Sequence, residues 1–187
     1  MSERADWDQR NRDKPPGDPE PFLLEMLPML PRGLALDVAA GRGRNAIPMA
    51  RAGIRVVAVD YSLDTMRALA ATARANRLTV FPVVADFGSF QIADRGYDVI
   101  VNINYLDRAL FPAFARGLKR GGVLLADTFL IDQAATGHPR NPDFMLQHYE
   151  LRDLLAGLEL LSYREGLTVY PDGSHAWRAS ALARRGS

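Results

Sequence analysis

Two glycines and an acid stand close together where an apolar run meets the start of a helical pattern. The segment LALDVAAGRGRNA spans residues 34–46 and contains Asp37, Gly41 and Gly43. Glycine lets the backbone approach a ligand closely, and the free N–H groups at a helix amino terminus attract acceptor-rich or anionic groups. The spacing therefore predicts a ligand-binding loop that follows a buried strand.

The same loop satisfies the pattern of dinucleotide-binding proteins. Gly41, Gly43 and Ala46 match G-x-G-x-x-G/A, and Asp60 falls 19 residues after Gly41, at the end of the next apolar run. A short carboxylate there can accept hydrogen bonds from two ribose hydroxyls. It can instead cap the helix expected to begin near Ser62, so both roles stay open.

Two acidic positions discriminate between the ligands that such a loop can hold. Asp37 lies four residues before Gly41, where it would repel a pyrophosphate and attract a cationic amino acid end. Asp86 ends a later apolar run and is followed by Phe87. A carboxylate can accept from the exocyclic amine of adenine while an aromatic ring packs on the base, although a turn acid beside a core aromatic is the alternative. Together these residues favour S-adenosylmethionine over NAD.

The elements that must position these residues alternate between apolar runs and helical patterns, which indicates a parallel sheet. Pro82 lies inside the third strand and favours an edge position for it. The turn Pro171-Asp172-Gly173-Ser174 predicts a terminal antiparallel hairpin. Strands are expected at residues 34–40, 54–60, 78–86, 97–103, 121–129, 158–170 and 174–184, and helices near 22–30, 45–52, 63–76, 108–119 and 150–157.

The chain divides into an arm and one domain. Residues 1–21 are rich in charge, proline and glycine and cannot bury much apolar surface, so they are expected to form a flexible N-terminal arm. Residues 22–187 are expected to form a single domain, because the chain is too short for two enzyme-sized domains.

In their order, the segments LDVAAGRGRNA, VVAVDYS, VVADF, YDVIVNINYL and LKRGGVLLADTF resemble class I S-adenosylmethionine-dependent methyltransferases. GRGRNA, NYLDRALFP and HPRNPDFMLQHYEL are most similar to small bacterial methyltransferases of the tellurite-resistance type. The family's loop usually begins D-x-G, and Ala39 stands here at that glycine. The resemblance implies an α/β fold: a single doubly wound Rossmann-like sheet, mostly parallel, with strand order 3-2-1-4-5-7-6 and an antiparallel terminal hairpin.

The resemblance also implies how the residues divide among parts of the cofactor, whose product form is S-adenosylhomocysteine. The acid and glycines of the loop would contact the methionine end, Asp60 the ribose, and Asp86 with Phe87 the adenine. Arg44 or Asn45 would contact the methionine carboxylate or the arm. The residues expected to bind the cofactor are Asp37, Ala39, Gly41, Gly43, Asn45, Asp60, Tyr61, Asp86, Phe87 and Asn102.

Candidate catalytic residues follow the fourth strand, because ligands of open α/β sheets bind beyond the carboxyl ends of strands. We select Asn104 and Tyr105, which turn formation or helix capping explains equally well. Residues 131–150 are a candidate lid. Within them His148 is a candidate general base, with a solvated loop histidine as the alternative. Three widely spaced histidines and no cysteine indicate no metal site.

Composition restricts the partners. The 23 basic and 22 acidic residues are distributed along the chain, which argues against nucleic acid. The polar start and the absence of a long apolar stretch argue against a signal peptide and a membrane span, and favour the cytoplasm. We expect a small-molecule substrate and a monomer or weak homodimer.

Three functions fit these observations. The leading one is transfer of a methyl group from S-adenosylmethionine to a small molecule by in-line displacement, in which alignment and desolvation supply most of the rate. The second is an NAD-dependent oxidoreductase, which G-x-G-x-x-A and Asp60 support but which lacks a Tyr-x-x-x-Lys pair. The third is a non-catalytic S-adenosylmethionine-binding module.

Overall fold

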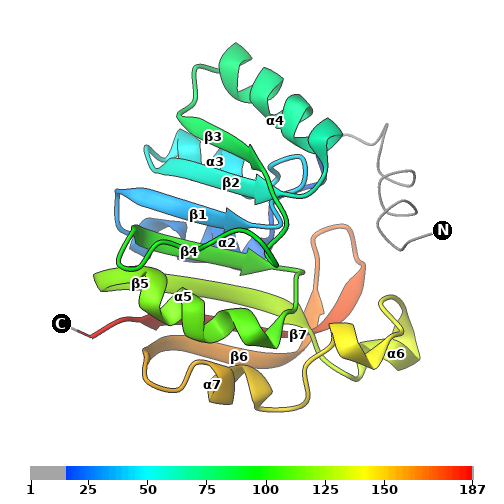
Figure 1. The fold of residues 1–187 in the computed structure, drawn as a ribbon. Coiled ribbons are helices and arrows are strands. Elements are labelled where there is room, and N and C mark those ends of the chain that lie inside the picture. The colour runs from blue at the N-terminus through cyan, green and yellow to red at the C-terminus, as the bar shows by residue number, and fades with distance from the viewer. Residues whose placement is uncertain (1–15, 187) are drawn as a thin grey trace.

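The computed structural model describes residues 16–186, which fold around one seven-stranded sheet (Figure 1). The strands lie in the order β3-β2-β1-β4-β5-β7-β6. The first five strands are parallel, and β7 is antiparallel to both of its neighbours. This topology confirms the predicted fold class. The strands are β1 Leu34–Val38, β2 Arg55–Asp60, β3 Val80–Val84, β4 Tyr97–Ile103, β5 Leu118–Phe129, β6 Glu159–Val169 and β7 His175–Arg184.

Helices cover both faces of the sheet. The core on one face includes side chains of α2, α3 and α4, and the core on the other includes side chains of α5 and α7. A doubly wound sheet requires this arrangement, since each parallel strand is buried on both sides. The helices are α2 Pro21–Met26, η1 Leu27–Met29, α3 Ala46–Arg51, α4 Leu63–Ala75, η2 Arg108–Leu110, α5 Phe111–Gly117, α6 Gln133–Thr136, η3 Pro142–Phe144 and α7 Glu150–Leu154.

Strand β1 shows why its sequence is apolar at successive positions. Ala35 belongs to the same core as Met49 of α3, whereas the next residue, Leu36, belongs to the core of Phe114 on α5. Both strand residues have no exposed surface. Because successive side chains of a strand point to opposite faces, a strand buried on both sides reads as a continuous apolar run.

The predicted edge strand and terminal hairpin are both present. Pro82 lies in β3 and pairs with Ala58 of β2. Strand β3 is at one edge of the sheet, so the backbone N–H that proline lacks is not needed by a further strand. At the other edge, β6 and β7 form the antiparallel hairpin. Its turn is closed by the Tyr170 N–H, which donates to the Ser174 carbonyl at 2.8 Å.

Several expected elements differ from the structure: β1 and β3 are shorter than predicted, the helix expected at 22–30 is split into α2 and η1, and β5 begins three residues earlier than predicted. The helix predicted over 108–119 is split into η2 and α5 and ends at Gly117, and β5 begins at once with Leu118. A Cβ atom at Gly117 would lie 2.6 Å from Ile92 Cγ2, so close packing explains the glycine. The candidate lid, residues 131–150, for which no helix was predicted before residue 150, contains α6 and η3. These elements are too short to produce a recognisable periodicity.

Residues 1–15 of the predicted arm lie outside the described residues. The end of that arm is held against the domain: Pro21 opens α2, and Glu20 is buried with only 3% of its surface exposed. The Glu20 N–H donates to Asn45 Oδ1 at 3.1 Å, after the glycine loop. None of the helices within residues 16–186 has the length and apolar composition needed to cross a bilayer.

Candidate active site

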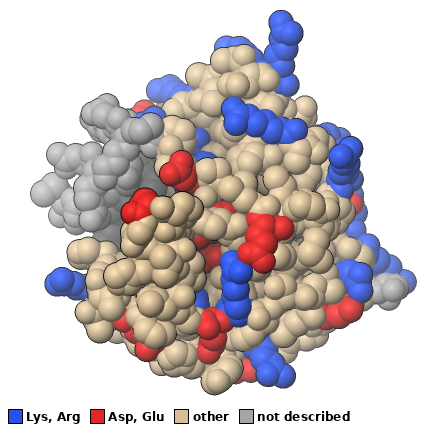
Figure 2. Space-filling model, turned by 180° about the vertical axis from the view of Figure 1, so that it is seen from behind, with Lys and Arg blue, Asp and Glu red and all other residues tan. Residues whose placement is uncertain are grey.

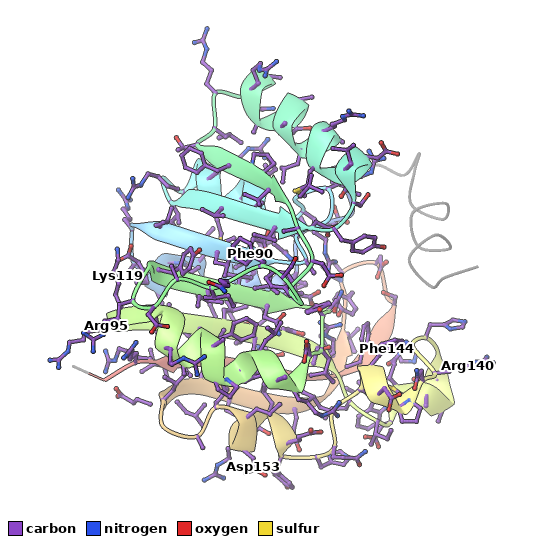
Figure 3. The ribbon with its side chains drawn as sticks, in the orientation of Figure 1. Phe90, Arg95, Lys119, Arg140, Phe144 and Asp153 are labelled. Atoms are coloured by element: carbon purple, nitrogen blue, oxygen red, sulfur yellow. The ribbon has the colours of Figure 1, made fainter. Side chains whose placement is uncertain are left out.

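The predicted ligand-binding residues meet where the strand order changes direction. Strands β1 and β4 are neighbours, and the chain winds outward from them in opposite directions, which is where open α/β sheets bind ligands. The parallel strands end on the side where α6 and the β6–β7 hairpin project (Figure 1). Arg140 and Phe144 lie on this side, opposite Arg95 and Lys119 (Figure 3).

The glycine loop after β1 runs through left-handed backbone conformations. The φ angles of Ala39, Gly41 and Gly43 are +52°, +53° and +83°. A Cβ atom at Gly43 would lie 2.3 Å from Leu69 Cδ1 of α4, so this glycine is required for close packing as well as for its φ angle. Ala39 adopts a conformation that glycine reaches without strain, which explains why the resembling family has glycine there.

Asp37 is an acid buried in the middle of the sheet. It pairs in register with Ala58 of β2 and Val101 of β4, and 1% of its surface is exposed. Its Oδ2 atom has no hydrogen-bond partner among the described residues. Burial raises the pKa of Asp37 to about 7, with Arg44 lowering it and Asp60 raising it further. A cationic group at this position would offset the cost of burying the carboxylate.

Asp60 joins the glycine loop to the start of α4. Its Oδ2 accepts from the Gly41 N–H at 2.8 Å and its Oδ1 from the Ser62 N–H at 2.9 Å. The helix cap itself is Ser62, whose Oγ accepts from the Thr65 N–H. The Thr65 hydroxyl also lies 3.5 Å from Asp60 Oδ1, so the carboxylate is oriented by both the glycine loop and the first turn of α4. The half-buried Tyr61 follows directly.

The residues after β3 form a turn beside an aromatic cluster. Asp86 Oδ1 accepts from the Gly88 N–H at 2.8 Å, as the turn interpretation requires. The Phe87 ring centroid lies 5.6 Å from that of Phe90 and 5.8 Å from that of Tyr105. The turn after β3 and the loop after β4 therefore approach each other through these rings, which offer a planar apolar surface.

Asn102 lies on β4 next to the last residue of β1. It pairs with Val38 on one side and Ala126 on the other, and 2% of its surface is exposed. Its Oδ1 atom also has no hydrogen-bond partner among the described residues. Two neighbouring strands, β1 and β4, thus each carry a buried side-chain oxygen without a donor, and such atoms usually have a partner in the functional protein.

Asn104 is fixed by two hydrogen bonds at the end of β4. Its N–H donates to the Asp127 carbonyl at 2.9 Å, and its Oδ1 accepts from Arg178 Nη2 at 2.7 Å. Its φ angle is +59°, a conformation that asparagine tolerates better than most residues. The adjacent Tyr105 contributes its ring to the aromatic cluster.

Sequence reasoning missed a buried ionic cluster, which consists of Glu20, Asp127 and Arg178. Arg178 Nε donates to Asp127 Oδ1 at 2.6 Å, and its Nη2 lies 3.8 Å from Glu20 Oε2. All three side chains are at most 4% exposed. Arg178 and Asp127 each interrupt an apolar run, which was the available signal. Their pairing follows only from the antiparallel contact of β5 with β7.

Glu20 links this cluster to the glycine loop. Its Oε2 lies 3.6 Å from Arg44 Nη2, and its Oε1 accepts from the Tyr170 hydroxyl at 3.2 Å. Burial raises the pKa of Glu20, and Arg178 opposes the shift. Arg44 and Asn45 therefore both contact the end of the predicted arm, one of the two roles that the resemblance left open for them.

His148 is engaged by two carboxylates. Its Nε2 lies 2.8 Å from Asp132 Oδ2 and its Nδ1 lies 3.2 Å from Glu165 Oε1. The loop that carries it is tied down by Arg108, which donates to Glu150 and to the Met145 carbonyl. Because both ring nitrogens already face acids, we do not include His148 in the proposal below.

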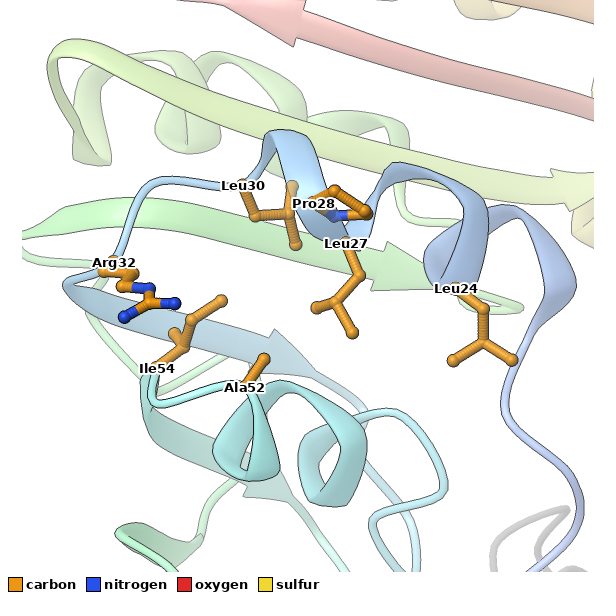
Figure 4. Close-up of a pocket in the computed structure, with 7 residues that line it drawn as sticks. All are labelled: Leu24, Leu27, Pro28, Leu30, Arg32, Ala52 and Ile54. Atoms are coloured by element: carbon orange, nitrogen blue, oxygen red, sulfur yellow. The ribbon is translucent and has the colours of Figure 1, made fainter.

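A cavity of about 310 Å³ lies elsewhere, between η1 and the end of α3 (Figure 4). Arg32 lies two residues before β1 and Ile54 directly before β2, and both line the cavity, so it lies toward the amino ends of these strands. On the face shown in Figure 2, acidic and basic side chains of the described residues are interspersed. Within residues 16–186 no group of three or more histidine, aspartate or glutamate side chains could hold a metal ion.

Comparisons of the sequence with known proteins find similarity to methyltransferases. Residues 35–122 match a family model described as a methyltransferase domain. The demethylmenaquinone methyltransferase of Renibacterium salmoninarum is 29% identical over 114 residues, which cover 58% of this chain and 46% of that protein. This chain thus spans less than half the length of that curated relative.

Solved structures show the same fold. TehB from Haemophilus influenzae superposes with a TM-score of 0.77 at 19% identity, over 96% of this chain and 66% of that one. A Burkholderia thailandensis 1,6-didemethyltoxoflavin-N1-methyltransferase superposes with a TM-score of 0.71 at 20% identity, over 98% and 87%. The chain has the fold of class I S-adenosylmethionine-dependent methyltransferases, as its sequence resemblance predicted.

Proposed function

We propose that this protein is an S-adenosylmethionine-dependent methyltransferase that acts on a small molecule. The observation that carries the proposal is Asp37, a buried acid whose Oδ2 has no partner among the described residues, next to a glycine loop at the switch point of the sheet. A ligand with an ammonium group would supply the missing partner. The match of residues 35–122 to methyltransferase domains supports the same conclusion.

Each residue of the site would contact a different part of the cofactor. Asp37 would accept from the ammonium group of the methionine end, while the backbone around Gly41 and Gly43 allows close approach. Asp60 would accept from the ribose, and Asp86 with Phe87 would hold the adenine. The cofactor supplies a methyl group already activated on a sulfonium. The chain's own residues would therefore act by orienting the substrate and excluding water.

The alternative ligand NAD fits the site less well. Helix α3, whose amino end would face a pyrophosphate, has only six residues. The carboxylate of Asp37 lies where a pyrophosphate would approach this helix. A buried carboxylate near two phosphates costs electrostatic energy, and Arg44, the cation that lowers the pKa of Asp37, also lies 3.6 Å from Glu20. We therefore do not propose an oxidoreductase.

A small-molecule substrate is supported by a sequence relative and by a solved structure of the same fold. One is named as a demethylmenaquinone methyltransferase, and another was solved with bound 1,6-didemethyltoxoflavin and S-adenosylhomocysteine. We propose that this chain likewise methylates a small organic molecule, as a monomer or weak homodimer in the cytoplasm. Asn104 and Tyr105 are the residues proposed to face the substrate.

The first experiment is calorimetric titration of the full chain with S-adenosylmethionine, S-adenosylhomocysteine and NAD in parallel. We expect binding of both adenosyl compounds and none of NAD. Binding of NAD alone would reject the proposal. Turnover of any substrate, followed as S-adenosylhomocysteine release, then separates an enzyme from a non-catalytic binding module.

Asp60→Asn should weaken the binding of S-adenosylhomocysteine by about 1–3 kcal/mol, because buried hydroxyl and amide donors lose a charged acceptor. The exposed Asp64 in the first turn of α4 provides the matched control. Asp64→Asn removes the same charge nearby and should leave the dissociation constant unchanged. Equal affinities of the two variants would exclude Asp60 from the site.

A further inference from the structure

The side-chain amide of Asn104 has one orientation that its surroundings permit. Its Oδ1 lies 2.7 Å from Nη2 of Arg178. A guanidinium group only donates hydrogen bonds, so the atom that faces Arg178 must be the amide oxygen. The assignment therefore rests on chemistry, and it places the two N–H donors of Nδ2 on the other side of the amide.

Those donors are available to a ligand. Asn104 is exposed, and among the residues described its Nδ2 donates to no acceptor. The residue directly follows the central strand β4, beside the glycine loop of β1 and next to Tyr105 of the aromatic cluster. A planar molecule packed against these rings would meet the Asn104 donors at its edge.

Arg178 is held rigidly enough to impose this orientation. It donates to Asp127, its guanidinium carbon lies 4.5 Å from the centroid of the Phe129 ring, and 2% of its side chain is exposed. The backbone of Asn104 is fixed as well, through its N–H to the Asp127 carbonyl. Both the position and the direction of the amide are therefore set before a ligand arrives.

The charges around Asn104 balance. Two cations, Arg178 and Arg44, lie within ion-pair distance of two acids, Asp127 and Glu20. The ionic cluster together with Arg44 therefore carries no net positive charge that would select a strong anion. Recognition at Asn104 then depends on hydrogen bonding, for which a carbonyl oxygen is a suitable partner.

We propose that Asn104 determines substrate specificity by donating a hydrogen bond to a carbonyl oxygen of the substrate, and that Arg178 is the positioning residue that keeps the amide in this orientation. The proposal rests on the proposed methyltransferase function and names the class of its substrate: a small planar molecule with a carbonyl group near the atom that receives the methyl group.

The test compares three neutral probes of similar shape: acetophenone with a carbonyl oxygen, α-methylstyrene with a methylene group in its place, and aniline with donors only. Each is titrated into the ¹⁵N-labelled full chain in complex with S-adenosylhomocysteine, and NMR signals of the Asn104 side chain and backbone are followed. We expect acetophenone to bind roughly tenfold more tightly than α-methylstyrene, the usual effect of one hydrogen bond.

Asn104→Asp is the decisive variant. Aspartate keeps an oxygen for Arg178 and tolerates a positive φ, so the fold is retained, but it presents an acceptor to the ligand. The preference should change to aniline. A second variant, Arg178→Lys, keeps a cation beside Asp127 yet releases the Asn104 amide, and should reduce the preference for acetophenone while backbone spectra stay native.

Equal responses to acetophenone and α-methylstyrene, including no response of Asn104 to either, would overturn the inference. So would an Asn104→Asp variant that keeps the original preference. Failure of the proposed function is seen separately, as absence of S-adenosylhomocysteine binding in calorimetry before any probe is added.

Discussion

Replacing Asp37 by asparagine should stabilise the ligand-free protein at pH 8. Burial raises the pKa of Asp37 from 3.8 to about 7, so the folded state holds this proton more tightly than the unfolded state does. The stability from the protonated acid is complete below about pH 4 and is lost as the pH rises through about 7. The loss amounts to about 4 kcal/mol. Urea denaturation at pH 5 and pH 8 should show about 2.6 kcal/mol of this loss, because the unfolded state is already ionised at pH 5, and it should show it in the natural protein only.

The same substitution should abolish tight cofactor binding. The binding of an ammonium group that loses a buried carboxylate partner is weakened by roughly 1.5–3 kcal/mol. In the natural protein, binding a cation to Asp37 requires the deprotonated acid, so affinity should rise with pH up to about 7. Calorimetry at pH 6 in two buffers of different ionisation enthalpy should report a proton released on binding.

Asp98, on the neighbouring strand β4, is the matched control. Burial there is outweighed by Lys119 and the Leu34 N–H, which lower the pKa of Asp98. Asp98→Asn should therefore reduce stability at neutral pH, the opposite sign, and leave cofactor binding intact. If Asp37→Asn behaves like Asp98→Asn, the assignment of Asp37 is wrong.

Arg178→Met should cost about 3–5 kcal/mol of unfolding free energy, because it leaves the buried Asp127 and Glu20 without their shared cation. The double variant Arg178→Met, Asp127→Asn removes one of the two stranded charges and leaves Glu20 beside Arg44, so it should recover part of the loss. Chemical denaturation measures both. A single substitution that costs less than about 1 kcal/mol would show that the ionic cluster does not stabilise the fold.

The control for Arg178 lies on the same strand. Arg184 pairs with Glu159 at 2.8 Å, but both side chains are about half exposed. Solvent screens such a pair, so Arg184→Met should change stability by less than about 1 kcal/mol. Comparison of the two arginines isolates the effect of burial from the effect of losing an ion pair.

Local patterns were sufficient to predict most of the sheet. The run YDVIVNI forms β4 with the expected bounds, Tyr97–Ile103, because a strand buried on both faces is apolar at successive positions. Pro82 correctly indicated an edge strand. The short elements α6 and η3 were not predicted, since three or four residues span about one helical turn and leave no room for an apolar pattern to repeat.

The sequence by itself determined the parallel sheet and the glycine loop with Asp37 and Asp60, because both depend on spacing within βαβ units of about 30 residues, and the resemblance to a known family implied the strand order. The tertiary structure decided the ionic cluster and the direction of the Asn104 amide. Arg178 meets Asp127 across 51 positions and Asn104 across 74, and Tyr170 meets Glu20 across 150. Such partners are selected by the pairing of strands and the docking of the arm's end, and no local pattern encodes them.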